Sequence, residues 1–260
     1  MQLIKRAVLL LASLPVVWGA KASNEDWMSR LPDTVKVCRV SIPGTHDSGT
    51  AGVGILTRHY ARTQKLSIAN QWDAGIRFFD LRPKIEDGTL RIYHGPANCH
   101  LGFEEALLII KRELEQHPSE FCVVMTNSAG GSLEGVDMTM DLINTLFDIK
   151  MLAQFNAKMT VADIRGRVLF IHRDYRTNGR DWPGTVVLGW PGNGSSHHVR
   201  MMSSQEKSAV VWAQDYFTDG GKGNYLDTKW DKVTSLVGEF ASAPEGVWCI
   251  NHASGYTGSG

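Results

Sequence analysis

The strongest constraint on the fold of this chain is a series of short, almost wholly apolar runs separated by helical patterns. Such runs are typical of strands buried on both faces, as in a parallel sheet covered by helices. About seven of them in 260 residues favour an α/β fold with a TIM-type barrel, and a doubly wound open sheet is the alternative. The predicted strands cover residues 35–42, 76–82, 121–127, 167–173, 185–190, 209–216 and 246–251.

Amphipathic segments lie between these runs. Ser67 is a predicted helix N-cap, and spacings of three and four between apolar residues predict longer helices further on. An Asp-Gly pair indicates the turn of a hairpin. The helices are predicted over 67–74, 101–118, 136–149 and 228–240, the hairpin over 84–94, and Gly-rich loops over 174–184 and 191–204.

Polar side chains follow most of the predicted strands. In an α/β barrel the carboxyl ends of the strands meet around one mouth, where the active sites of such barrels are built. Strand ends also meet solvent, so one polar residue there says little, but the whole set indicates a functional cluster. Its members are His46, Arg82, His94, Asn127, Arg173, Asp215 and Asn251.

The stretch "SIPGTHDSGT" (41–50) places His46 and Asp47 directly after a tight turn. Pro43 fixes one backbone angle, and Gly44 permits a sharp change of direction. Thr45, Ser48 and Thr50 in the same stretch offer hydroxyl groups whose hydrogen bonds would hold the loop. A histidine presented in this way is a candidate acid–base group, since its ordinary pKa lies near neutral pH.

A second cluster comes from "IRFFDLR" and "YHGP". Asp80 and Arg82 alternate along a strand, so their side chains point the same way. The planar guanidinium of arginine suits phosphate oxygens. With His46 and His94 beside it, one imidazole can take a proton from an attacking hydroxyl and the other can protonate the leaving oxygen. The pattern indicates cleavage of a phosphodiester.

Together, "SIPGTHDSGT", "IRFFDLR" followed by "YHGP", and "RVLFIHR" resemble the catalytic X region of bacterial, metal-independent phosphatidylinositol-specific phospholipase C. The resemblance runs from about Trp27 to about Asn251. It implies a distorted TIM barrel that cuts phosphatidylinositol to diacylglycerol and inositol 1,2-cyclic phosphate. It also implies no cofactor and no metal, because Arg82 stands where calcium-dependent relatives have a carboxylate.

The resemblance assigns roles to the residues around the phosphate. His46 resembles the general base that deprotonates the inositol 2-hydroxyl, and His94 the general acid that protonates the diacylglycerol oxygen. Arg82 matches the arginine that contacts the phosphate, and Asp47 the aspartate that supports the acid histidine. Asp80, grouped with the substrate-binding residues, is expected to support the site from behind.

The resemblance also assigns residues to the inositol ring. Arg173 and Asp215 match positions that contact its hydroxyls. The aromatic residue that packs on the ring is expected to be Tyr216, with Phe217 as the other possible register. The family's inositol-contacting lysine corresponds to Ser128 here.

The chain ends soon after the seventh predicted strand, so we expect a barrel that lacks its last strand. In the bacterial family that strand carries an aspartate that orients the base histidine, and an unpaired edge is costly. Two alternatives to cleavage of phosphatidylinositol therefore stay open. One is a catalytically impaired module that binds inositol lipid, and the other is a phosphodiesterase of the same superfamily acting on another head group.

The N-terminus has the pattern of a signal peptide over residues 1–22. A basic start, the apolar run "AVLLLASLPVVWGA" and an Ala-Lys-Ala site follow one another. We expect an exported protein, secreted or periplasmic, whose catalytic barrel covers 23–260, and an N-terminal anchor helix is the alternative. The spacing of the four cysteines fits no zinc site. A pair of them could form a disulfide, or they could be buried thiols; they are Cys38, Cys99, Cys122 and Cys249.

The formal net charge is zero, which argues against binding to nucleic acid. The partner that the resemblance implies is phosphatidylinositol or a glycosylated inositol lipid, met by a monomer in transient contact with a membrane surface. Large apolar residues near the catalytic loop and in two later loops could make that contact or could be ordinary packed residues. They are Ile55, Leu56, Tyr60, Trp182 and Trp190.

Overall fold

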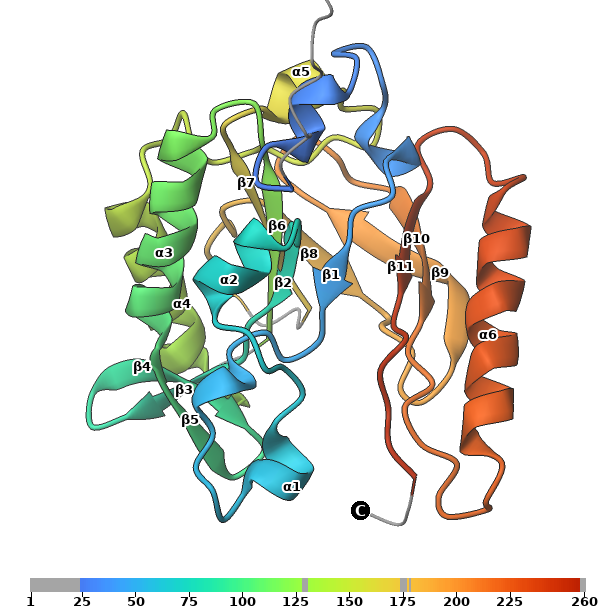
Figure 1. Cartoon of the computed structure of the whole chain (residues 1–260). Coiled ribbons are helices and arrows are strands. Elements are labelled where there is room, and N and C mark those ends of the chain that lie inside the picture. The colour runs from blue at the N-terminus through green and yellow to red at the C-terminus, as the bar shows by residue number, and fades with distance from the viewer. Residues whose placement is uncertain (1–23, 128–130, 174–176, 178, 258–260) are drawn as a thin grey trace, which may run out of the picture.

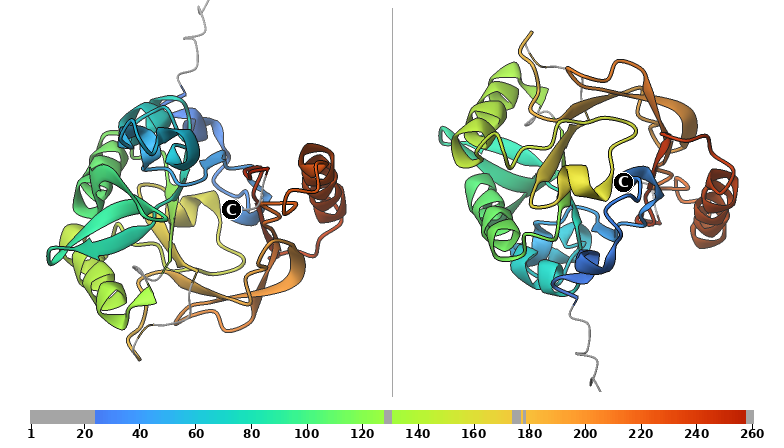
Figure 2. Two further views of the ribbon diagram at one scale, coloured as in Figure 1. Left: turned by 90° about the horizontal axis from the view of Figure 1, so that it is seen from below. Right: turned by 90° about the horizontal axis from the view of Figure 1, so that it is seen from above.

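A computed structural model describes residues 24–127, 131–173, 177 and 179–257. Its centre is one curled sheet of eight strands, which Figure 1 shows from the side and Figure 2 along the strands. In spatial order the strands are β1 (Gly44–Thr45), β2 (Phe78–Asp80), β6 (Cys122–Thr126), β7 (Val168–His172), β8 (Thr185–Leu188), β9 (Ser195–Met202), β10 (Ala209–Gln214) and β11 (Trp248–Asn251).

All neighbouring strands of this sheet are parallel except β9, which runs antiparallel to both β8 and β10. Six of the seven predicted strand segments form strands of the sheet. The predicted α/β barrel architecture is confirmed, as a curled sheet whose outer strands β1 and β11 do not pair with each other in the described residues.

The prediction of a strand over residues 35–42 was wrong. The backbone there forms a short 3₁₀ helix, η2 (Val37–Arg39), and the sheet is joined only at β1. Val37 and Cys38 are buried in the core inside the curl, and the Val37 N–H donates to the carbonyl of Met159 rather than to a neighbouring strand. The apolar pattern reflects this burial and not a sheet.

The predicted loop over 191–204 instead contains β9. This strand alternates buried and more exposed side chains, with Val199 and Met201 inside and Arg200 outside. Such alternation is typical of an antiparallel strand with one wet face. The polar Ser and His residues at its start hide the pattern in the sequence.

The predicted helices are all present, and Figure 1 shows most of them along the outer face of the sheet. The predicted hairpin gains a third strand and forms a small separate sheet. The helices are α1 (Arg58–Ala61), α2 (Ile68–Asp73), α3 (Phe103–Gln116), α4 (Leu133–Leu146), α5 (Val161–Ile164) and α6 (Tyr225–Phe240), and the small sheet holds β3 (Pro83–Glu86), β4 (Thr89–His94) and β5 (Ala97–Gly102).

The sheet separates two apolar cores. On β6, Val124 belongs to the core under the outer helices, whereas Val123 and Met125 belong to the core inside the curl. Successive side chains of a strand point to opposite faces, so a run without polar residues fills both cores. This explains why the parallel strands read as continuous apolar segments.

A buried ion pair fastens the end of the sheet opposite the strand mouths. Arg77 precedes β2 and Glu120 precedes β6, and their side chains are fully buried with Nε 2.9 Å from Oε2. The guanidinium also lies over the ring of Trp72 in α2, at 3.8 Å from its centroid. The pair therefore joins two central strands to a covering helix.

The gap between β1 and β11 forms an open seam in the curled sheet. It borders a cavity of about 780 Å³ whose lining is largely apolar and includes Ile42, Phe78, Trp248 and Ile250. At the amino end of β11, Arg39 crosses the seam, because its guanidinium donates to the carbonyl of Ala243 at 2.7 Å. The seam thus has one bridged end and one end at the strand mouths.

The four cysteines are free thiols in this structure, three buried and one partly buried. No helix in the described part of the chain is both long and apolar enough to cross a bilayer. The predicted signal peptide over residues 1–22 lies outside the described residues.

Candidate active site

The loop after β1 is held by the hydroxyl side chains that the sequence pattern singled out. Ser48 exchanges two hydrogen bonds with the Asp80 backbone: its N–H donates to the Asp80 carbonyl, and its Oγ accepts from the Asp80 N–H, both at 2.8 Å. Thr45 donates to Gln71 of α2 at 2.6 Å. Thr50 donates to the carbonyl of Asp47 at 3.0 Å. The loop is therefore fixed to β2 and α2.

His46 lies between two carboxylates. Its Nδ1 is 3.0 Å from Oδ2 of Asp80, and its Nε2 is 3.0 Å from Oδ2 of Asp47. Burial alone lowers the pKa of His46, but its hydrogen bonds to these carboxylates and their negative charges outweigh burial and raise the pKa to about 9. In this ligand-free site the imidazole is therefore protonated at neutral pH.

Asp47 occupies the centre of the site and adopts an unusual backbone conformation. Its φ of 45° lies in the left-handed region, which aspartate tolerates better than most residues. The carboxylate is buried, and Oδ2 lies 3.0 Å from His46 and 3.4 Å from Nε2 of His94. One carboxylate thus stands between the two imidazoles.

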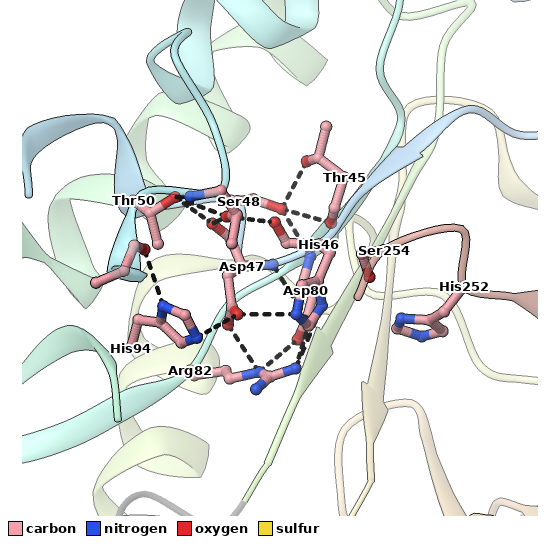
Figure 3. A network of polar contacts seen from close by, with 12 residues as sticks. Thr45, His46, Asp47, Ser48, Thr50, Asp80, Arg82, His94, His252 and Ser254 are labelled. Atoms are coloured by element: carbon pink, nitrogen blue, oxygen red, sulfur yellow. Dashed lines mark hydrogen bonds and ion pairs between the residues drawn. The ribbon is translucent and has the colours of Figure 1, made fainter. Parts of the chain in front are cut away.

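Arg82 completes the charge cluster. Its Nε lies 2.9 Å from Oδ1 of Asp47, and its Nη2 lies 2.9 Å from Oδ2 of Asp80. Burial would raise the pKa of Asp80, but the positive charges of Arg82 and His46 hold it well below its usual range. Figure 3 shows the guanidinium beside both histidines.

His94 ends β4 and reaches the site from the small sheet. Its Nδ1 lies 2.8 Å from the carbonyl oxygen of Ala61 in α1, which accepts a hydrogen bond from the ring nitrogen. The proton on Nδ1 fixes the ring, so Nε2 faces Asp47. The four residues predicted to be catalytic therefore lie together, although they come from three segments of the chain.

A second polar group lies at the ends of β7 and β10. Nη1 of Arg173 is 3.7 Å from Oδ2 of Asp215, and its guanidinium lies over the ring of Trp190 at 5.4 Å. Trp190 Nε1 donates to Oδ2 of Asp215 at 2.8 Å. The predicted pair Arg173 and Asp215 is brought together, with a tryptophan that holds both.

The other residues predicted for the inositol ring fall differently. Tyr216 stacks on Tyr225 of α6, and in the described residues no hydrogen bond or ring contact joins it to Arg173 or Asp215. Ser128 lies outside the described residues. The aromatic residue that contacts both Arg173 and Asp215 is Trp190, and the assignment of Tyr216 to the inositol ring stays a prediction.

Sequence reasoning missed two residues of the site, Trp190 and His252. Trp190 ends a predicted strand but was considered only for contact with lipid. His252 follows the last strand and lies edge-on to His46, with ring centroids 5.7 Å apart. The rule that residues after strand ends line the mouth would have found it, one position beyond Asn251. Trp182, the other lipid candidate of the loops, is buried and stacks on His172.

His46, Asp47 and Asp80 offer ligand atoms within 4.8 Å of one another, the kind of cluster that can hold a metal ion. The guanidinium of Arg82 already contacts both carboxylates. An arginine in that position supplies the positive charge that a metal would bring, so these residues fit a metal ion poorly.

No family model matches the chain. It is 32% identical over 161 residues to a Listeria monocytogenes 1-phosphatidylinositol phosphodiesterase, an alignment that covers 59% of this chain and 50% of the relative. With the Staphylococcus aureus protein of the same name it is 28% identical over 226 residues, which cover 83% of this chain and 70% of the relative. The chain thus spans between half and about two thirds of the length of these relatives.

The fold agrees with the sequence comparison. A solved structure of S. aureus phosphatidylinositol-specific phospholipase C superposes with a TM-score of 0.75 at 22% identity, over 92% of this chain and 80% of that one. In sequence the chain is thus similar to bacterial 1-phosphatidylinositol phosphodiesterases, and in fold it is similar to a bacterial phosphatidylinositol-specific phospholipase C.

Proposed function

We propose that this protein is a phospholipase C that cuts phosphatidylinositol to diacylglycerol and inositol 1,2-cyclic phosphate without a metal ion. One observation carries the proposal: a single buried carboxylate, Asp47, contacts the imidazoles of His46 and His94 while the guanidinium of Arg82 lies beside it. Two imidazoles and a fixed cation are the groups that an intramolecular phosphodiester cleavage needs.

In the first step His46 takes the proton of the inositol 2-hydroxyl, whose oxygen attacks the phosphorus. The bond from phosphorus to the diacylglycerol oxygen breaks, and His94 gives that oxygen a proton. Arg82 faces the phosphoryl oxygens as negative charge develops on them. The five-membered cyclic phosphate is the product, and its opening by water would return both histidines to their starting states.

The second polar group suits a polyol. Asp215 accepts and Arg173 donates hydrogen bonds, and Trp190 offers a ring face next to both. Burial would lower the pKa of Arg82, but the negative charges of Asp80, Asp47 and Asp215 raise it, so Asp215 is close enough to act on this guanidinium. An inositol ring bound between the two groups would have its phosphate on Arg82.

Purified protein would be incubated with phosphatidylinositol in detergent micelles with excess chelator, and the products followed by ³¹P NMR. A cyclic phosphate signal is the expected result. Activity only after Ca²⁺ or Mg²⁺ is added would favour a metal-dependent phosphodiesterase for another head group. Binding of the lipid with no turnover would favour an impaired binding module.

The same proposal includes contact with a membrane surface. Ile55 and Leu56 are 78% and 85% exposed, and they precede α1, which Figure 1 shows at the mouth of the sheet. Replacing both by Ala should weaken sedimentation with phosphatidylinositol vesicles and leave cleavage of a soluble inositol phosphodiester unchanged. Ile149→Ala is the matched control, since Ile149 is 71% exposed and follows α4 at the other end of the sheet.

We also propose that the protein is exported, as the pattern over residues 1–22 predicts. Expression of the full chain with a C-terminal tag, followed by N-terminal sequencing of the protein from the medium or periplasm, tests this. A mature start near Ser23 is expected, whereas protein that keeps residues 1–22 in the membrane fraction would favour an anchor helix.

A further inference from the structure

His252 is held rigidly at the carboxyl end of β11. The backbone N–H of His252 donates to the backbone carbonyl of Gln214 at 2.9 Å, and the backbone carbonyl of His252 accepts from Nε2 of Gln214 at 2.7 Å. The buried ammonium of Lys229 in turn donates to Oε1 of Gln214 at 3.0 Å. The residue is 8% exposed, so its ring has little freedom to move.

The ring of His252 stands between the two halves of the site. It lies edge-on to His46 at 5.7 Å and an interplanar angle of 77°, and edge-on to Trp190 at 5.6 Å and 80°. Its Nδ1 is 3.9 Å from Oδ1 of Asp215. Figure 3 shows it across from His46, on the side away from Arg82.

His46 needs a neighbour on that side because the sheet is open there. His46 and His252 both line the cavity along the seam. The carboxylates of Asp80 and Asp47 contact the two nitrogens of the His46 imidazole, but free space on the cavity side would let the ring turn to another rotamer. The ring of His252, steeply inclined to that of His46, lies on this cavity side.

We propose that His252 is a positioning residue, which holds the imidazole of His46 against Asp80 across the open seam. Only the kinetic test of this proposal depends on the proposed function, because it measures cleavage of phosphatidylinositol. The charged and titratable groups that face His252 are His46, Asp80, Asp215 and Arg173. Burial lowers the pKa of His252, so at neutral pH it adds no positive charge beside the protonated His46.

The kinetic test compares His252→Ala with His252→Phe, which keeps a ring edge but no ring nitrogen. His252→Ala should lower kcat by about 10- to 100-fold with little change in KM, the size expected when a reacting group is misplaced by about 1 Å. His252→Phe should retain most of kcat. His198→Ala removes an exposed histidine of β9 and should behave as wild type.

Wild-type kcat in His252→Ala, or a loss in His252→Phe as large as in His252→Ala, would overturn the proposal. Should His252→Ala fail to fold, His252→Leu, which fills the space without a ring edge, takes its place with the same expected loss. Circular dichroism on each variant separates misfolding from misplacement.

A second readout needs no turnover. The imidazole signals of His46, identified by their loss in His46→Asn, are titrated by NMR in wild type and in His252→Ala. The pKa of His46 should move down toward its ordinary value in the variant, because a displaced ring leaves Asp80. The same pKa in both proteins would overturn the proposal. A shift in a protein that does not cleave phosphatidylinositol would refute the proposed function and support the role of His252.

Discussion

At the scale of single residues, the site is organised around Asp47. Its carboxylate is buried, its backbone is held in a left-handed conformation, and it contacts two imidazoles and a guanidinium. A buried carboxylate among three groups that can carry positive charge is well compensated, and its charge helps to raise the pKa of His46 and of Arg82. The resting state of His46 follows from this arrangement.

The fraction of the enzyme in which His46 can act as a base should therefore rise with pH up to about 9, while His94 must stay protonated to act as the acid. His46 acts as a base only when neutral, and its pKa is raised to about 9, so kcat/KM increases as the imidazole loses its proton. Initial rates on a soluble inositol phosphodiester between pH 5 and 10 measure this. A rising limb centred on the ordinary histidine pKa would show that substrate binding, or the assigned contacts, leave His46 unperturbed.

Stability should show the opposite trend over the same pH range. A raised pKa in the folded state adds stability that is fully present below the ordinary pKa of histidine and is lost as pH rises through the folded value. The difference in unfolding free energy between wild type and His46→Ala should therefore shrink between pH 6.5 and about 9. Urea unfolding at several pH values checks it, and a constant difference would contradict the raised pKa.

Asp80 is the carboxylate that orients Nδ1 of His46. It is 3.0 Å from His46 and is covered by Arg82. Asp80→Asn should lower kcat by about 10- to 100-fold, since the imidazole loses its anchor, and should move the rising limb of the pH profile to lower pH. Asp73→Asn, at the exposed end of α2, serves as the control. An unchanged pH profile in Asp80→Asn would mean that Asp47 alone raises the pKa of His46.

The residues around the phosphate could be predicted from the sequence because they lie in short motifs. His46 and Asp47 are adjacent, and Asp80 and Arg82 are two apart on one strand. Trp190 and His252 could not be assigned in this way, because each is an isolated residue whose neighbours come from other strands. Tyr216 was assigned to the inositol ring from the family resemblance, with Phe217 as the other register, and its ring stacks on Tyr225.

At the scale of elements, the catalytic loop depends on how closely β1 approaches β2. Gly44 lies against Phe78, and a Cβ at this position would come within 2.9 Å of the Phe78 Cβ. A two-residue strand can hold the loop only because the approach is this close. The glycine of the motif is therefore required by packing as well as by the turn.

Gly44→Ala should destabilise the fold by about 1–3 kcal/mol, the usual effect of overpacking, and should lower kcat because the loop that carries His46 is pushed away from β2. Thermal unfolding and the micelle assay measure the two effects. Gly192→Ala is the matched control, because a Cβ there meets nothing within 4 Å. Full activity in Gly44→Ala would show that the loop tolerates displacement of β1.

The elements that sequence patterns failed to give share one cause. The run over 35–42 is apolar because it lines the inner core, and β9 is partly polar because one of its faces meets solvent. Periodicity reports which side chains are buried, and it does not report whether the backbone pairs with a neighbouring strand. The parallel strands β6 and β7, buried on both faces, were therefore the easiest to predict.

At the scale of the whole molecule, the sheet is fastened firmly at the end away from the site. Glu120→Ala should destabilise the protein by about 3–5 kcal/mol, because it leaves the Arg77 guanidinium buried without its counter-charge. Urea unfolding measures this loss. Glu115→Ala, which removes only an exposed partner of Lys111, should cost less than about 1 kcal/mol. Equal losses of unfolding free energy in Glu120→Ala and Glu115→Ala would show that burial of the Arg77–Glu120 pair does not set the size of the effect.

The open seam divides the active site between the two edges of the sheet. His46 follows β1 at one edge and His252 follows β11 at the other, while Arg39 joins the two edges at the far end of the seam. Because Arg39 bridges the seam at the far end, the separation between the two imidazoles is the distance most sensitive to a widening of the seam. The distance between the rings of His46 and His252 therefore reports how wide the seam is, and a ligand that contacts both rings would hold the two edges of the sheet together.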